Sequence, residues 1–364
     1  MRREPLEWTV LGVVPIVLVL AFTIGVRHHQ PAYDFRPVWQ AGRDVAHGRD
    51  PYPKPASISS NPKAPHDEFI YPAAVAVMMV PFSLLPFGVA AGLFMTLLVV
   101  SVLATLYILG VRDWRCYGAA FASIPVLESL RLGAWSPLLA LGVAAAWVLR
   151  DRRWALPIVV CAAVLAKLFL WPLFVWLLAT RRWGAAARSA FLTAAVGAIG
   201  WAVVGFDTLA AYPDLLRKMT DVQFRNTIGV EGLLGSLGAG ATSAHDGTLI
   251  AAIVGSAAIV AAARRRGEPE LAFGVAILVA LLVSPIAWLH YDTLLLVPVA
   301  LASRRMSAWW LVPLLLWVTP QPQSWGSPWR IALPMAVAAV AVLGRHAAGG
   351  LIRWKPLRGV AQPG

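Results

Sequence analysis

The first residue with catalytic potential is Asp34, which lies in the run Pro31-Ala32-Tyr33-Asp34-Phe35. An apolar run over residues 8–26 ends shortly before it, so the carboxylate should stay close to a membrane surface. A carboxylate in that place could act as a general base toward a hydroxyl substrate. The competing interpretation is a helix N-cap or a solvated loop acid, because residues 38–48 have the pattern of a short amphipathic surface helix.

A second cluster is the run Ser284-Pro285-Ile286-Ala287-Trp288-Leu289-His290-Tyr291-Asp292. The proline should end an apolar helix, and four side chains with polar groups follow within five positions. Trp288 and Tyr291 suit a membrane interface in any case. His290 and Asp292 do not have that explanation, and a histidine there could contact a phosphate or carry a proton. The competing interpretation is a histidine that caps a broken helix.

Three further residues could bind an anionic or sugar substrate. Lys167 lies between two apolar runs, where a lysine is costly unless it is paired, and a lipid-linked phosphate would be a natural partner. The alternative is that Lys167 extends to the membrane interface. Arg131 could hold a phosphate bidentately, but Glu128 precedes it by three residues and favours a structural ion pair. Tyr71 could line a sugar or acceptor pocket, or belong to the aromatic belt.

Common catalytic signatures are missing. The sequence has no phosphate-binding glycine loop with lysine and serine or threonine, no HExxH, no zinc spacing and no serine nucleophile elbow. Its two cysteines, Cys116 and Cys161, cannot make a disulfide framework. We therefore expect no cofactor and no metal site, although dependence on a metal stays open.

The composition is that of a membrane protein. Of 364 residues, 59% are hydrophobic and 13% are charged, against about 25% charged in soluble domains. The mean hydropathy is +0.68. The formal charge of +13 does not indicate nucleic-acid binding, because the arginines form short clusters between apolar runs, as the positive-inside rule predicts.

These elements predict an all-α transmembrane bundle, with surface helices in the loop that follows the first span. About twelve spans are expected, several of them short for a bilayer crossing. They lie near residues 8–26, 88–110, 116–130, 135–149, 155–167, 168–180, 184–204, 247–263, 270–285, 290–302, 307–319 and 330–344. The segment Phe69–Pro86 is apolar but broken by prolines, and is interpreted as re-entrant or interfacial.

Arginine clusters test this layout. They begin with Arg2/Arg3 and recur between alternate spans, so all fall on one side only if residues 69–86 do not cross. Positive charge marks the cytoplasm, which puts both termini there in a multi-pass plasma-membrane protein. The other side holds two long loops, 27–69 and 205–246, and a varied set of polar residues, which predicts a periplasmic or extracellular site. Residues 1–345 would be one catalytic domain and residues 346–364 a basic cytoplasmic tail.

The order of these motifs resembles glycosyltransferase family 87. The similarity extends over roughly residues 1–345. It rests on Tyr33-Asp34-Phe35, on Phe69-Ile70-Tyr71-Pro72-Ala73, on Lys167 ahead of Pro172 and, most specifically, on Ser284-Pro285-Ile286-Ala287-Trp288-Leu289-His290-Tyr291. Members of this family are polyprenol-phosphate-mannose-dependent alpha-mannosyltransferases, so the resemblance implies Asp34 as catalytic base and His290 as a contact of the donor phosphate. It also implies a transmembrane fold of the lipid-sugar-dependent glycosyltransferase (GT-C) type, with the active site on the periplasmic side.

The combined expectation is a membrane enzyme that moves a sugar from a polyprenyl phosphate to a hydroxyl of a cell-envelope glycolipid or glycan, with inversion. Asp34 and His290 would be catalytic, and the substrate-binding residues would be Lys167, Arg131, Tyr71, Trp288, Tyr291 and Asp292. Mannose follows from the resemblance alone, and arabinose and glucose stay open, as does the acceptor. The alternative is a transporter or flippase, since broken helices and charges within the membrane suit that class too.

Overall fold

The computed structural model describes residues 31–61, 68–265, 268–319 and 327–349, and these residues form helices without any strand. The expected first span 8–26, Arg2/Arg3 and the tail from residue 350 lie outside the described residues. The helices are α2 (Phe35–Ala46), η1 (Pro55–Ser57), α3 (Ala73–Ser83), α4 (Phe87–Ile108), α5 (Trp114–Ala122), α6 (Ile124–Leu132), α7 (Ser136–Val148), α8 (Ala155–Ala166), η2 (Leu168–Leu170), α9 (Pro172–Ala179), α10 (Trp183–Val204), α11 (Phe206–Gln223), α12 (Val230–Ser236), α13 (Ala241–Ala263), α14 (Pro269–Leu282), η3 (Leu289–Leu295), α15 (Leu296–Ala302), η4 (Ala308–Leu311), η5 (Pro313–Val318) and α16 (Pro328–Gly349).

Three described helices, α4, α10 and α13, are long and apolar enough to cross a membrane. A fourth crossing is possible if α6 and α7 form one span, although they are bent by 120°. The expected number of about twelve full spans is therefore not confirmed. Many of the apolar runs form helices of 10–17 residues, which are short for a bilayer crossing.

Several expected spans are broken for a local reason. Residues 116–130 divide into α5 and α6 at Ser123, and Pro125 sits in the first turn of α6. Proline cannot supply the backbone N–H that would continue the preceding helix. Residues 290–302 begin as the 3₁₀ helix η3 before α15, and residues 307–319 form two 3₁₀ helices, η4 and η5. Hydrophobicity alone could not predict these breaks.

The first outer loop contains the expected surface helix, which is α2 and begins a few residues earlier than the sequence indicated. The second long loop, 205–246, is not an open loop. It forms α11, then α12 and the start of α13. The helix α11 has 18 residues and contains Pro213 and several charged residues, a composition that hides a helix in the sequence.

The faces of the long helices show what surrounds them. In the most apolar stretches of α10 and α13, only 17% of the residues are buried. Their exposed side chains are large and apolar, including Phe191, Ile199, Leu249, Ile253 and Val254. Such a continuous apolar surface would be unfavourable in water, whereas it suits lipid. The chain is a membrane protein.

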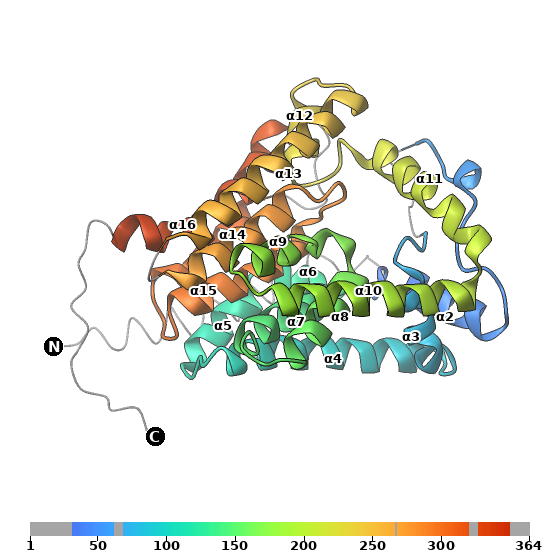
Figure 1. The fold of residues 1–364 in the computed structure, drawn as a ribbon, viewed down its shortest axis with the longest axis horizontal. Helices are drawn as coiled ribbons and strands as arrows, with labels where there is room; N and C mark the ends of the chain where they lie inside the picture. Colours follow the sequence, from blue (N-terminus) through green and yellow to red (C-terminus); the bar gives the residue numbers. More distant parts are fainter. Residues whose placement is uncertain (1–30, 62–67, 266–267, 320–326, 350–364) are drawn as a thin grey trace.

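Figure 1 shows how the helices are arranged. α13, α14 and α16 lie in one inclined group, while α4, α7, α8 and α10 run together along the other edge. α2 packs on α3, which in turn packs on α10, at the end of the molecule below α11. η3 contacts both α6 and α7. The segment that carries His290 therefore packs against the bend between these two helices.

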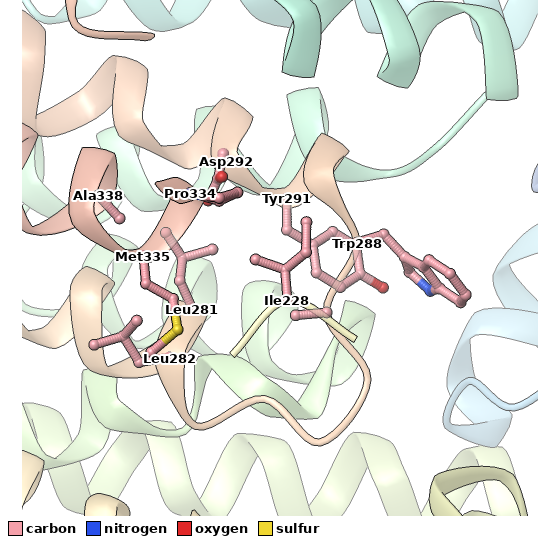
Figure 2. Close-up of a pocket in the computed structure, with 10 residues that line it drawn as sticks. Ile228, Leu281, Leu282, Trp288, Tyr291, Asp292, Pro334, Met335 and Ala338 are labelled. Carbon is pink, nitrogen blue, oxygen red and sulfur yellow. The ribbon is translucent and has the colours of Figure 1, made fainter. Parts of the chain in front are cut away.

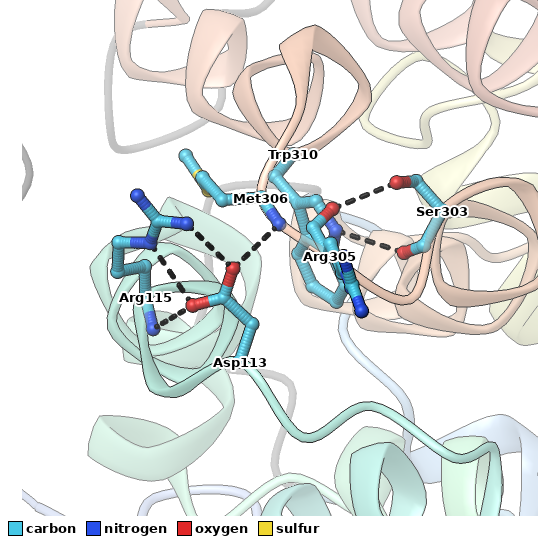
Figure 3. Close-up of polar contacts among 6 residues, drawn as sticks. All are labelled: Asp113, Arg115, Ser303, Arg305, Met306 and Trp310. Atoms are coloured by element: carbon cyan, nitrogen blue, oxygen red, sulfur yellow. Dashed lines mark hydrogen bonds and ion pairs between the residues drawn. The ribbon is translucent and has the colours of Figure 1, made fainter.

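The arginine clusters come together in pairs. Asp113, between α4 and α5, binds the side chain of Arg115 through both carboxylate oxygens and also accepts from the backbone N–H of Met306 at 2.9 Å (Figure 3). The Arg112/Arg115 loop therefore lies against the Arg304/Arg305 loop. Likewise, Arg182 donates to the backbone of Arg150. These contacts agree with one arginine-rich face.

Candidate functional site

Asp34 is positioned by a turn docked on the end of α6. The backbone N–H of Ala32 donates to the carbonyl of Arg131, and that of Asp34 to the carbonyl of Leu132, both at 2.8 Å. Gly133, with φ of +66°, ends α6 just there, and a Cβ on it would meet the Phe35 Cβ at 3.0 Å and the Ala32 Cα at 3.2 Å. Glycine is required on both counts, because it tolerates a positive φ and has no Cβ.

The Asp34 side chain is not a helix cap. The residue occupies the N-cap position of α2, yet its carboxylate makes no capping hydrogen bond. Its Oδ2 instead lies 3.8 Å from the Nε2 of His290, and its side chain is 27% exposed. That separation exceeds a hydrogen bond. The carboxylate therefore keeps its capacity to accept a proton, as far as the described residues are concerned.

Burial and neighbouring charges set the ionisation of Asp34, which lies outside the candidate membrane-crossing helices. The pKa of Asp34 is raised to about 6. Burial is the main cause, and the nearby cations of Lys167 and Arg131 partly offset it. Glu128 raises the pKa slightly. A carboxyl with this pKa is ionised at neutral pH but holds a proton more strongly than an ordinary aspartate, which suits a general base.

His290 is held in place through its backbone. It is buried in η3, and its carbonyl accepts from the Oγ of Ser129 at 3.3 Å. The same Oγ is 3.0 Å from the Oγ1 of Thr293. Ser129 on α6 therefore joins the helix that positions Asp34 to the one that carries His290. The sequence analysis missed Ser129, since a serine within an apolar helix has no distinctive pattern.

Lys167 is half-buried, and its ammonium group lies over aromatic rings. It lies where α8 stops and η2 begins, in an extended backbone conformation. Its Nζ is 3.8 Å from the centre of the Tyr71 ring and 5.5 Å from that of Tyr291. Phe169, which follows Lys167 in η2, stacks on Tyr291. The two tyrosine rings thus hold an ammonium group beside Asp34 by cation–π attraction.

Arg131 makes the ion pair with Glu128 that the spacing favoured. Its Nε and Nη2 donate to the Oε2 of Glu128 at 3.0 and 2.6 Å. Glu128 is 3% exposed, and its Oε1 has no partner within the described residues. The pair leaves the remaining guanidinium donors of Arg131 available, so an ion pair and an anion contact are compatible.

One of the candidate residues lies elsewhere. Asp292 lines a pocket between η3, α14 and α16, together with Pro334 and Met335. Trp288 borders the same pocket, but its indole points away from the other labelled residues (Figure 2). Asp292 is 6% exposed, and its Oδ2 lacks a partner among the described residues. In a 3₁₀ helix successive side chains point about 120° apart. Asp292 therefore turns toward α16 and not toward Asp34. Tyr291 borders both places.

The site thus gathers Asp34, His290, Lys167, Arg131, Tyr71 and Tyr291 from segments far apart in the chain. One carboxylate can accept a proton, and two cations beside it can stabilise a phosphate. No group of three or more histidine, cysteine, aspartate or glutamate residues suited to a metal occurs in the described ranges. This combination fits the departure of a phosphate while a hydroxyl loses its proton.

Two comparisons with known proteins found similar sequences. The profile of glycosyltransferase family 87 matches residues 69–285, a range that contains Tyr71, Arg131 and Lys167 and ends just before His290. A protein of Mycolicibacterium smegmatis is 28% identical over 383 aligned positions, which cover 92% of this chain and 89% of that protein. It is named polyprenol-phosphate-mannose-dependent alpha-(1-2)-phosphatidylinositol pentamannoside mannosyltransferase. No solved structure matches the chain.

Proposed function

Because this chain belongs to glycosyltransferase family 87, we propose that it transfers mannose from a polyprenyl phosphate carrier to a hydroxyl of a cell-envelope glycolipid or glycan, with Asp34 as the general base. Family membership makes it a glycosyltransferase, and the transporter or flippase alternative loses its support. The observation that carries the proposal is the approach of Asp34 to His290 and the cations of Lys167 and Arg131.

The role of Asp34 follows from its surroundings. An acceptor hydroxyl loses its proton as its oxygen bonds to the anomeric carbon, and a carboxylate within hydrogen-bond reach lowers that barrier. Asp34 has no capping bond to occupy it, and burial moves its pKa to about 6. His290, Tyr71 and Tyr291 border the same space and would orient the donor.

The leaving group explains the cations. A polyprenyl phosphate sugar is a phosphodiester with one negative charge, and release of the sugar adds a second charge to the phosphate. Asp34 takes up a proton in the same step, so the total charge of the site does not change. Lys167 and the free donors of Arg131 would stabilise the phosphate as its charge grows. This interaction would be stronger in the transition state than in the bound substrate, so it would lower the barrier to the chemical step.

The donor and acceptor are suggested by the relative. Its name specifies polyprenol-phosphate-mannose as donor and a phosphatidylinositol mannoside as acceptor. A single displacement at the anomeric carbon inverts its configuration, so a beta-linked donor would give an alpha product. The lipid tail of the donor would lie against the apolar helices, and its phosphate would reach the Lys167 ammonium. We propose the plasma membrane as the location.

The orientation follows from the arginines. The Arg112/Arg115, Arg150/Arg182 and Arg304/Arg305 regions would face the cytoplasm. Asp34 and His290 would then face the periplasm or cell exterior, where a lipid-linked sugar is the available donor because nucleotide sugars stay in the cytoplasm.

The test is a transfer assay with the purified protein in detergent or liposomes. Labelled polyprenyl phosphate mannose should give a mannosylated phosphatidylinositol mannoside, and a nucleotide-linked mannose should give none. Asp34→Asn should abolish transfer. The matched control is Asp44→Asn, on the neighbouring helix α2, where the carboxylate pairs with Arg49 and not with any residue of the candidate site; it should retain transfer. Transfer from the nucleotide sugar, or none from any polyprenyl phosphate sugar, would refute the proposal.

A further inference from the structure

The connection from α14 to η3 depends on one side chain from the second outer loop. Thr227, ahead of α12, bonds both backbone groups of Ala287, which lies three residues before His290. The Thr227 Oγ1 accepts from the Ala287 N–H at 2.6 Å and donates to the Ala287 carbonyl at 3.2 Å. The N–H of Ile228 donates to the same carbonyl at 2.8 Å. Figure 2 shows Ile228 beside the segment that carries Trp288.

This contact is closed to water. Thr227 is 1% exposed and Ala287 is 2% exposed. A Cβ on Gly229 would lie 2.8 Å from the Leu282 carbonyl oxygen and 3.5 Å from that of Ser284, so the two chain segments touch directly. A buried backbone N–H that loses its partner in such a place finds no replacement.

The connection itself has little other regular bonding. Residues 283–288 belong to no helix, and an irregular chain between apolar helices must have its polar groups satisfied by protein. Ser284 bonds locally to the carbonyl of Ile286. Ala287 instead has its N–H and carbonyl satisfied from a different part of the chain. Thr227 and Ile228 therefore supply the bonds that hold Ala287, two residues before η3 begins.

We propose that Thr227 is a positioning residue, whose hydroxyl fixes the start of η3 so that the His290 ring meets Asp34 and the donor phosphate. This inference rests on the proposed function. Two residues hold the backbone around His290. Ser129 bonds the carbonyl of His290 itself, and Thr227 bonds Ala287, three residues earlier. A displacement of about 1 Å at a reacting group can lower a rate about a hundredfold.

The chain offers closely matched variants. Thr227→Val keeps the shape and removes the hydroxyl, whereas Thr227→Ser keeps the hydroxyl and removes a methyl group. Thr105→Val is the control, because Thr105 is fully buried but bonds only within its own helix α4. We expect Thr227→Val to lower kcat about 10- to 100-fold, with the KM for acceptor changed less than about threefold. Thr227→Ser and Thr105→Val should stay within about threefold of the parent.

A second measurement does not need activity. Hydrogen–deuterium exchange of the peptide that contains Ala287 should become about tenfold faster in Thr227→Val and remain unchanged in Thr227→Ser. Unchanged exchange, a loss of kcat in Thr227→Ser equal to that in Thr227→Val, or an effect on KM alone would overturn the positioning role. If the parent protein transfers no sugar, the proposed function fails, and the exchange data still decide whether Thr227 holds the segment.

Discussion

The Nε2 of His290 lies 3.8 Å from the Oδ2 of Asp34, although one residue comes from the first described turn and the other from a late 3₁₀ helix. α6 explains the meeting. The backbone at its end holds Asp34, and its Ser129 holds His290. A single helix therefore supports both Asp34, the proposed base, and His290, the proposed phosphate contact.

The dependence of transfer on pH follows from the pKa of Asp34, which burial raises to about 6. The base acts only when it is ionised, so kcat/KM should be constant above that pH. Below it, kcat/KM should fall about tenfold for each unit of pH. The measurement is kcat/KM for acceptor between about pH 4.5 and 8 in liposomes. A constant value down to pH 5 would show that this carboxyl is not the base.

Asp34 should also reduce stability. Its pKa is raised from 3.8 to about 6, so the folded state favours the protonated form, and stability increases as the pH falls from above 6 toward 3.8. At neutral pH the ionised group costs at most about 3 kcal/mol, and about 1–2 kcal/mol after allowance for its partial exposure. Asp34→Asn should therefore raise the melting temperature by a few degrees in detergent. Asp44→Asn should not raise it, and an Asp34→Asn protein that melts earlier would contradict the account.

Lys167 should matter for chemistry more than for folding. Its ammonium group lies over Tyr71, where we propose that it contacts the donor phosphate. Removal of one preorganised charge donor lowers rates about 10²- to 10³-fold, so Lys167→Met should lower kcat/KM for donor by that factor. Lys218→Met is the control, since Lys218 is on α11 and, within the described part of the chain, bonds Ser60 alone. A loss below about tenfold would remove Lys167 from the phosphate site.

Gly133 should be intolerant of any side chain. Its φ of +66° and the 3.0 Å approach to Phe35 mean that an alanine there is both strained and crowded. We expect Gly133→Ala to destabilise the protein by about 1–2 kcal/mol and to impair transfer, because the turn carrying Asp34 must move. Gly92→Ala on α4, where a Cβ meets nothing, should instead stabilise by about 0.5–1 kcal/mol. Equal effects of the two changes would contradict this reading of the turn.

Sequence patterns could predict the grouping but not the full geometry. The residue types at Asp34, Lys167 and His290 stand out because charge and imidazole are unusual beside apolar runs. Their position outside the arginine-rich loops indicated one site, and the structure brings them together. The role of each residue in catalysis stays a prediction.

Other features depend on contacts that no local pattern contains. The expected number of about twelve spans is not confirmed. Hydrophobicity does not show where a proline breaks an apolar run into shorter helices, as at Pro125. Asp292 was grouped with His290 by sequence proximity, but a 3₁₀ turn directs it toward α16. Thr227 and Ser129 act through hydrogen bonds to backbone atoms distant in the sequence, which residue type alone does not reveal.

The most direct test of the central claim is the single-turnover rate of sugar transfer, measured with donor already bound and a saturating acceptor, in the parent protein and in Asp34→Asn. This measurement separates the chemical step from binding. The account predicts that Asp34→Asn slows this step at least about a thousandfold, while the affinity for polyprenyl phosphate mannose stays within about threefold. A rate within about tenfold of the parent would show that another group accepts the proton.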